Sequence, residues 1–161
     1  VGQPLPSGLD EMARLLIIYH SRTGGSRQMS EAAAEAARAA GDHIILGSPN
    51  VVRGGSHKGN ASALDLITMG LCDALASDYH YPSPRRAALM LEKSGLLPLE
   101  RAWGFVSSGP ARVLGFRDRG TLEESKRADL VILDTQDQVA ATLSGGCVSY
   151  MNGAIAARFL A

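Results

Sequence analysis

Near the start of the chain, short continuous apolar runs stand on either side of a segment with apolar positions at helical spacing. Residues 15–19 are continuously apolar, which is typical of a strand buried in a parallel sheet. Residues 27–40 are alanine-rich with apolar positions at helical spacing, and Gly41 follows where a helix C-cap is expected. The apolar stretch 44–46 predicts a second strand. The pattern therefore predicts a strand, a helix and a strand, the repeating unit of an α/β fold.

The middle of the chain continues this alternation, with turn and capping residues at each boundary. Ser62, with Asp65 three residues later, resembles a capping pair at a helix start. Ser83 followed by Pro84 predicts another helix start. The predicted elements are a helix that Gly70 ends, a strand over 71–76, a helix from Ser83 to Gly95 and a further segment of this kind over 98–107.

The C-terminal part is richer in strand signals. Three runs, 128–134, 139–143 and 147–151, have the apolar composition of strands. Asn152-Gly153 is a pair that favours tight hairpin turns, so we expect it to lead into a last strand from Ala154. The predicted fold class is α/β with a C-terminal β-rich segment.

The composition is that of an ordinary folded domain. The chain has 161 residues, of which 45% are hydrophobic and 20% charged, so it can bury one core and differs from disordered sequences. Its 16 basic and 16 acidic side chains give a net charge of zero, which argues against a broad surface for nucleic acid or an anionic membrane. The run 15–19 is far shorter than the roughly 20 residues of a membrane span. We therefore expect neither nucleic acid nor a membrane as partner.

Two other features bear on the compartment. Residues 1–13 contain prolines and glycines but no basic segment followed by an apolar one, so we expect a flexible tail and no secretory signal. Cys72 and Cys147 lie far apart and match no metal-ligand spacing, which favours buried thiols in a reducing compartment. We therefore expect a cytoplasmic protein.

A loop rich in hydroxyl groups and glycine follows the first predicted strand. Ser21, Thr23, Gly24 and Ser26, with free N–H groups at the start of the next helix, could hold a phosphate. Residues 14–42 resemble the first strand, loop and helix of flavodoxin-like FMN reductases, which implies FMN bound by these four residues. The alternative is a glycine-containing turn capped by a serine, which is common in α/β proteins.

A larger resemblance runs from about residue 46 to the C-terminus. The stretch 47–60 (GSPNVVRGGSHKGN), the triplet 77–79 (SDY) and the phrase 126–130 (KRADL) are similar to the α-D-ribose 1-methylphosphonate 5-triphosphate diphosphatases of the amidohydrolase superfamily. This resemblance implies a (β/α) barrel, a divalent metal that is usually zinc, and release of diphosphate in the carbon–phosphorus lyase pathway. The chain would then comprise a tail (1–13), a flavodoxin-like βα unit (14–46), part of an amidohydrolase barrel (47–118) and a β segment (119–161).

The same resemblance implies roles for individual residues. Asp78 would be a metal ligand and the catalytic group that orders the attacking water and accepts its proton. Arg53, His57, Lys58 and Asn60, on a glycine-rich loop, would bind the phosphate oxygens of a small substrate. Without the resemblance, these residues would be read as a solvated polar loop and a turn at a strand end.

Several features of complete amidohydrolase barrels are missing from this sequence. The four histidines, His20, His43, His57 and His80, have no HxH spacing. No bridging lysine or glutamate is identifiable either. About 115 residues match, whereas a barrel takes roughly 200 or more. Three hypotheses follow: a diphosphatase whose missing strands come from a second copy or another chain, an FMN-binding module, and an inactive fused or truncated remnant that associates through exposed strand edges.

Overall fold

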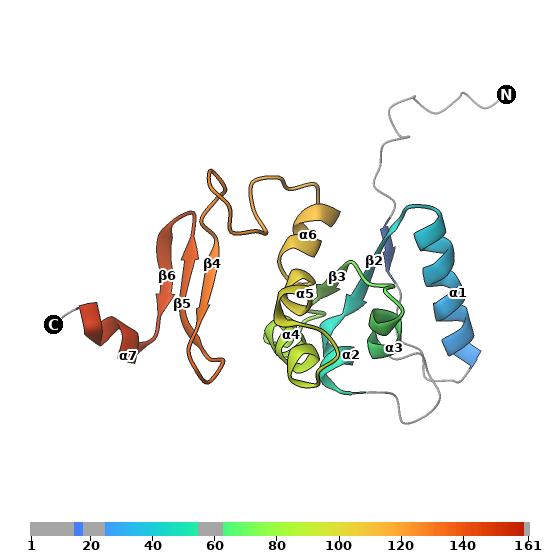
Figure 1. Cartoon of the computed structure of the whole chain (residues 1–161), viewed down its shortest axis with the longest axis horizontal. Helices are drawn as coiled ribbons and strands as arrows, with labels where there is room; N and C mark the ends of the chain where they lie inside the picture. The colour runs from blue at the N-terminus through green and yellow to red at the C-terminus, as the bar shows by residue number, and fades with distance from the viewer. Residues whose placement is uncertain (1–14, 18–24, 55–62, 160–161) are drawn as a thin grey trace. The chain divides into compact units, whose positions relative to one another are not determined.

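The computed structural model describes residues 15–17, 25–54 and 63–159 (Figure 1). The chain divides into two compact units, residues 1–87 and 88–161. The described elements of the first unit are β1 (Leu15–Ile17), α1 (Gly25–Ala39), β2 (His43–Gly47), α2 (Ser48–Val52), α3 (Ala63–Thr68) and β3 (Ala74–Ala76). Helix α4 (Ser83–Lys93) contains the boundary between the two units. The second unit continues with α5 (Leu99–Gly104), α6 (Ser108–Val113), β4 (Leu130–Leu133), β5 (Val139–Ser144), β6 (Cys147–Met151), α7 (Gly153–Ala156) and the 3₁₀ turn η1 (Ala157–Phe159).

The first unit is built on a parallel sheet with the order β1-β2-β3. Leu16 lies opposite Ile44, and Leu46 lies opposite Leu75. Along β2 the buried residues Ile44 and Leu46 alternate with half-buried ones, so one set of side chains enters the core. These pairings confirm the predicted α/β class. Because the strands run in the same direction, their carboxyl ends lie at one edge of the sheet, where ligands bind in open α/β sheets.

Helix α1 packs against this sheet through small side chains. Ala34 and Ala37 are buried, and the helix lies beside β2 (Figure 1). The helix predicted over 27–40 is confirmed, with its start at Gly25. Gly41 has φ 79°, and the N–H of Asp42 donates to Ala37 O at 2.8 Å, as expected of a glycine C-cap.

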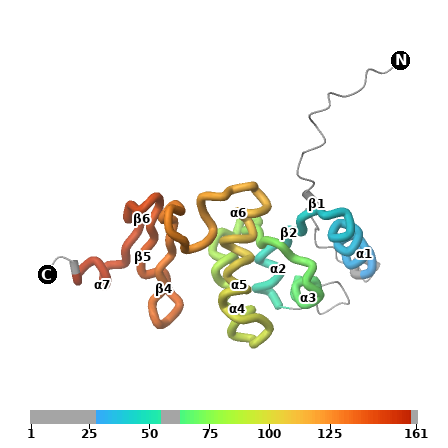
Figure 2. The backbone as a smooth tube through the Cα atoms, turned by 45° about the horizontal axis from the view of Figure 1, so that its top comes forward, coloured from blue at the N-terminus to red at the C-terminus, as the bar shows by residue number. Residues whose placement is uncertain are grey.

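The second unit contains an antiparallel sheet with the order β4-β5-β6, whose strands lie side by side in Figures 1 and 2. The strands predicted over 128–134, 139–143 and 147–151 are present as β4, β5 and β6. Leu130 lies opposite Leu143, and Ala141 opposite Met151, with register shifts within each strand pair. Gly145 and Gly146, with φ 58° and 82°, form the turn between β5 and β6, because a tight hairpin turn needs positive φ at both central positions.

The expected hairpin at Asn152-Gly153 is wrong. Asn152 has φ −71° and ψ 155°, and its side chain accepts a hydrogen bond from the N–H of Ile155 at 2.9 Å. Asparagine is as favourable at a helix N-cap as in a turn, and here it begins α7 rather than a last strand from Ala154.

Two boundaries also differ from the sequence prediction. The strand predicted over 71–76 begins only at Ala74, because the N–H of Leu71 bonds Leu66 O at 2.8 Å and so belongs to the end of α3. The glycine-rich segment predicted as a loop from residue 47 contains α2, whose second residue Pro49 has a φ suited to the first turn of a helix. The helices expected before Gly70, before Gly95 and over 98–107 are confirmed as α3, α4 and α5.

The two cysteines have different environments. Cys72 is buried as expected, and burial, with the nearby charge of Asp73, raises the pKa of its thiol to about 12. Cys147 is exposed, contrary to expectation, because it begins the edge strand β6. Among the described residues, no helix combines the length and apolar character that crossing a bilayer requires.

Candidate functional site

The candidate segments from the sequence follow the carboxyl ends of parallel strands. Residues 48–54 follow β2 and residues 77–80 follow β3, so both are connected to the same sheet edge. Ser21, Thr23 and Gly24, and likewise His57, Lys58 and Asn60, lie outside the described residues, as does the side chain of Ser26. The described part of the candidate site therefore consists of Arg53, Asp78 and the residues that hold them.

Asp78 lies in a strained turn directly after β3. It has φ 45° and its neighbour Tyr79 has φ 62°, and both side chains are exposed. The turn is closed by the N–H of His80, which donates to Ser77 O at 2.9 Å. Positive φ at two successive residues other than glycine is costly, and such strain concentrates at functional sites. The turn presents the Asp78 carboxylate to solvent at the carboxyl edge of the sheet.

Arg53 ends the short helix that follows β2. Its N–H donates to Pro49 O at 3.0 Å, and Gly54, with φ 73°, donates to Val51 O at 3.1 Å. The Arg53 side chain is exposed. A guanidinium presents several N–H donors in a planar fork that matches phosphate oxygens. A role of Arg53 in phosphate binding stays a prediction.

Two buried serines connect these segments. Ser48, the first residue of α2, and Ser83, the first residue of α4, are both 0% exposed, and their hydroxyl oxygens lie 2.7 Å apart. Sequence reasoning missed this pair, since the residues are 35 positions apart and only the pairing of β2 with β3 brings them together.

The described residues do not form a metal site by themselves. No group of three His, Cys, Asp or Glu side chains gathers within the described ranges. At the carboxyl edge, the described segment after β3 offers Asp78 and His80, whereas a zinc site takes three or four protein ligands.

At the amino edge of the sheet, Asp73 connects β2 to helix α1. Its Oδ2 accepts the N–H of Ile44 at 2.8 Å, and its Oδ1 accepts Nη1 of Arg38 at 3.0 Å. Arg38 also donates to Gly70 O at 3.2 Å, so it joins α1 to the loop before β3. Burial favours a higher pKa for Asp73, but the Ile44 N–H and the Arg38 guanidinium outweigh it and hold the pKa below its usual value. These contacts make Asp73 a structural carboxylate.

We expect Asp73→Asn to lower the free energy of unfolding by about 1–3 kcal/mol at pH 7, because a charge-assisted hydrogen bond is lost. The folded pKa lies below the unfolded value of about 3.9, so this stabilisation is complete above about pH 5 and lost as pH falls through the folded pKa. Denaturant unfolding at pH 7 and pH 3 measures it, with Asp42→Asn as the control from the same edge. A cost of Asp73→Asn that is equal at both pH values would contradict the assignment.

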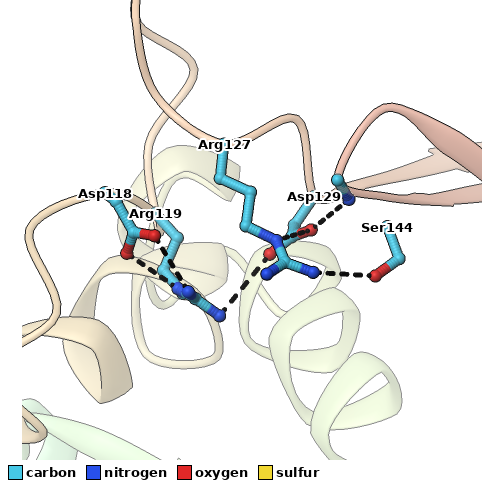
Figure 3. A network of polar contacts seen from close by, with 6 residues as sticks. Asp118, Arg119, Arg127, Asp129 and Ser144 are labelled. Atoms are coloured by element: carbon cyan, nitrogen blue, oxygen red, sulfur yellow. Dashed lines mark hydrogen bonds and ion pairs between the residues drawn. The ribbon is translucent and has the colours of Figure 1, made fainter.

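The segment 126–130 (KRADL) has a structural role in the second unit (Figure 3). Asp129 Oδ1 accepts the N–H of Gly145 at 2.7 Å and Nε of Arg127 at 2.8 Å, and Arg127 Nη2 donates to Ser144 Oγ at 3.2 Å. The Gly145 N–H, followed by Arg127 and Arg119, lowers the pKa of Asp129. Arg127 and Asp129 thus connect the β5–β6 turn to the loop before β4.

Comparison with curated proteins gives two relatives. The chain is 44% identical over 107 residues to the alpha-D-ribose 1-methylphosphonate 5-triphosphate diphosphatase of Escherichia coli K12, covering 65% of this chain and 28% of that protein. It is 42% identical over 60 residues to one component of the formyltransferase/hydrolase complex Fhc of Methylorubrum extorquens, covering 33% and 11%. The chain therefore spans less than a third of the length of these relatives.

Solved structures share the fold. A beta-aspartyl dipeptidase from Fervidobacterium islandicum AW-1 matches with a TM-score of 0.61 at 20% identity, covering 81% of this chain and 38% of that one. An amidohydrolase from Thermotoga maritima MSB8 matches with a TM-score of 0.52 at 16% identity, covering 79% and 42%. At these identities the matches establish the fold alone.

The family model described as "Amidohydrolase family" matches residues 13–144. That range includes the segment 14–42 that resembles a flavodoxin-like unit, so the FMN interpretation gains no support from it. The resemblance of the sequence to the diphosphatases is confirmed by the Escherichia coli relative. The chain belongs to the amidohydrolase family.

Proposed function

We propose that this chain is part of a metal-dependent hydrolase that releases diphosphate from a ribose 5-triphosphate, α-D-ribose 1-methylphosphonate 5-triphosphate, in phosphonate catabolism. The 44% identity to a protein named for this reaction supports the proposal. The structural observation that carries it is the strained turn that exposes Asp78 after β3, next to the strand that leads to Arg53.

We assign the chemistry to the carboxyl edge of the parallel sheet. Asp78 orders a water molecule and accepts its proton as the water oxygen bonds to the phosphorus nearest the ribose. The bond between that phosphorus and the bridging oxygen breaks, and diphosphate leaves. Arg53, His57, Lys58 and Asn60 bind the phosphate oxygens and offset the charge on the departing diphosphate.

A metal is part of the proposal, because metal dependence is typical of the superfamily. Zinc is the metal we propose, with Asp78 as one ligand. The other ligands would come from residues outside the described ranges, from a second copy or from another chain. The same sources would supply further strands beside β1 and β3, each of which pairs only with β2 among the described residues.

We place the protein in the cytoplasm.

An assay of both phosphate products tests the proposed function. Purified protein, with its zinc content measured, is incubated with a nucleoside triphosphate as an available ribose 5-triphosphate. We expect diphosphate and the nucleoside monophosphate in equal amounts, and loss of turnover after chelation. Orthophosphate as the sole product, or no turnover by zinc-loaded protein, would contradict the proposal. A yellow protein that binds FMN would favour the alternative reductase module.

A further inference from the structure

The Ser48–Ser83 pair is the most deeply buried polar contact at the carboxyl edge of the sheet among the described residues. Ser48 Oγ lies 2.8 Å from Ala76 O, at the end of β3. Ser83 Oγ lies 2.6 Å from His80 O and 3.3 Å from Ser77 O. The two hydroxyls therefore contact the backbone on both sides of Asp78.

Each hydroxyl has one proton, which limits how these contacts are made. Since the two oxygens are 2.7 Å apart, one must donate to the other. Either Ser48 donates to Ser83 and Ser83 to His80 O, or Ser83 donates to Ser48 and Ser48 to Ala76 O. In both arrangements a continuous chain of hydrogen bonds joins the start of α2 and the start of α4 to a backbone carbonyl two positions from Asp78.

We propose that Ser48 and Ser83 are positioning residues that hold the Asp78 turn in its strained conformation and fix it relative to α2, the helix that leads to Arg53. This inference rests on the proposed function for its catalytic consequence. A turn with two positive φ values persists only where its surroundings determine it, and the N–H of Ser83, which donates to His80 O at 2.8 Å, adds a further constraint.

A simple packing role explains the pair less well. Two apolar residues of similar volume would fill the same space without the desolvation cost of two hydroxyls. The hydroxyls instead provide directional bonds to the only segment that carries an exposed carboxylate at this end of β3 among the described residues. Loss of one bond would leave the core filled but allow the turn to relax.

Ser48→Ala and Ser83→Ala test the inference in the full chain, with Ser107→Ala as the matched control. Ser107 also donates its hydroxyl to one backbone carbonyl, Trp103 O at 2.9 Å. Amide hydrogen exchange is followed at His80 and Ser83, which close the turn, and at Leu75 as the reference in β3. We expect exchange at the turn to accelerate about tenfold relative to Leu75 in both variants, and not in the control.

Kinetics separate positioning from a purely structural role. We expect kcat for diphosphate release to fall about ten- to a hundredfold in Ser48→Ala and Ser83→Ala, with KM changed much less, because a displaced base acts on the chemical step. The double variant should lose no more than the larger single loss, since both hydroxyls act in one chain of bonds. Native exchange at the turn would overturn the inference, as would a loosened turn with unchanged kcat. If the unsubstituted protein releases no diphosphate, the proposed function fails, and the exchange data alone decide whether the serines hold the turn.

Discussion

Replacing Asp78 by asparagine is expected to lower the rate of diphosphate release about 10²- to 10⁴-fold, the usual range for loss of a general base. Asparagine keeps the size of the side chain and tolerates positive φ, so the turn with φ 45° at this position should survive. It loses the ability to accept a proton from water and the carboxylate charge that would help to hold zinc. The measurement is kcat for diphosphate release by the zinc-loaded protein.

Asp42→Asn is the matched control for this prediction. Asp42 precedes β2 and so lies at the amino edge of the same sheet, away from the strand ends that lead to Arg53 and Asp78. We expect it to retain turnover within about twofold, as is usual for substitutions that leave the chemical step untouched. Equal loss in both variants, or full activity of Asp78→Asn, would remove Asp78 from the proposed mechanism.

Gly120→Ala is expected to destabilise the second unit by about 2–5 kcal/mol, the sum of a backbone and a packing cost. Gly120 has φ 95°, where a residue with a side chain is strained. An added Cβ would lie 2.7 Å from Ala111 Cβ and 3.1 Å from the Cα of Ser108. Both contacts involve α6, so the helix itself would have to move. Denaturant unfolding followed by circular dichroism measures the loss.

Gly115→Ala separates the two costs. Gly115 also has positive φ, 71°, but an added Cβ would meet nothing within 4 Å. We expect this variant to lose only the backbone cost of about 1–2 kcal/mol. If both variants lost the same stability, close packing of Gly120 on α6 would not be what requires glycine there.

Most of the fold could be predicted because its signals are local. Gly41, Gly70 and Gly95 each end a helix at positive φ, and only glycine adopts that conformation without cost. Local signals failed where one residue type serves two structures. Asn152 suits both a hairpin turn and a helix N-cap, and contacts beyond the dipeptide select the cap.

The candidate site could be predicted only in part. Asp78 was found because it follows a predicted strand and matches a family motif. The Ser48–Ser83 pair and the contact of Arg38 with Asp73 were not, since each joins residues more than thirty positions apart. The register of β2 and β3 decides these contacts, and apolar periodicity predicts strands without their register.

Binding of inorganic diphosphate, mapped residue by residue, tests most directly whether the proposed site lies at the carboxyl edge of the parallel sheet. In an NMR titration of ¹⁵N-labelled protein, we predict that amide shifts concentrate at Arg53, Gly54 and residues 77–79. Shifts confined to the opposite edge around Asp42 and Asp73, or to the β4–β6 sheet, would contradict the account. So would the absence of any shift at millimolar diphosphate.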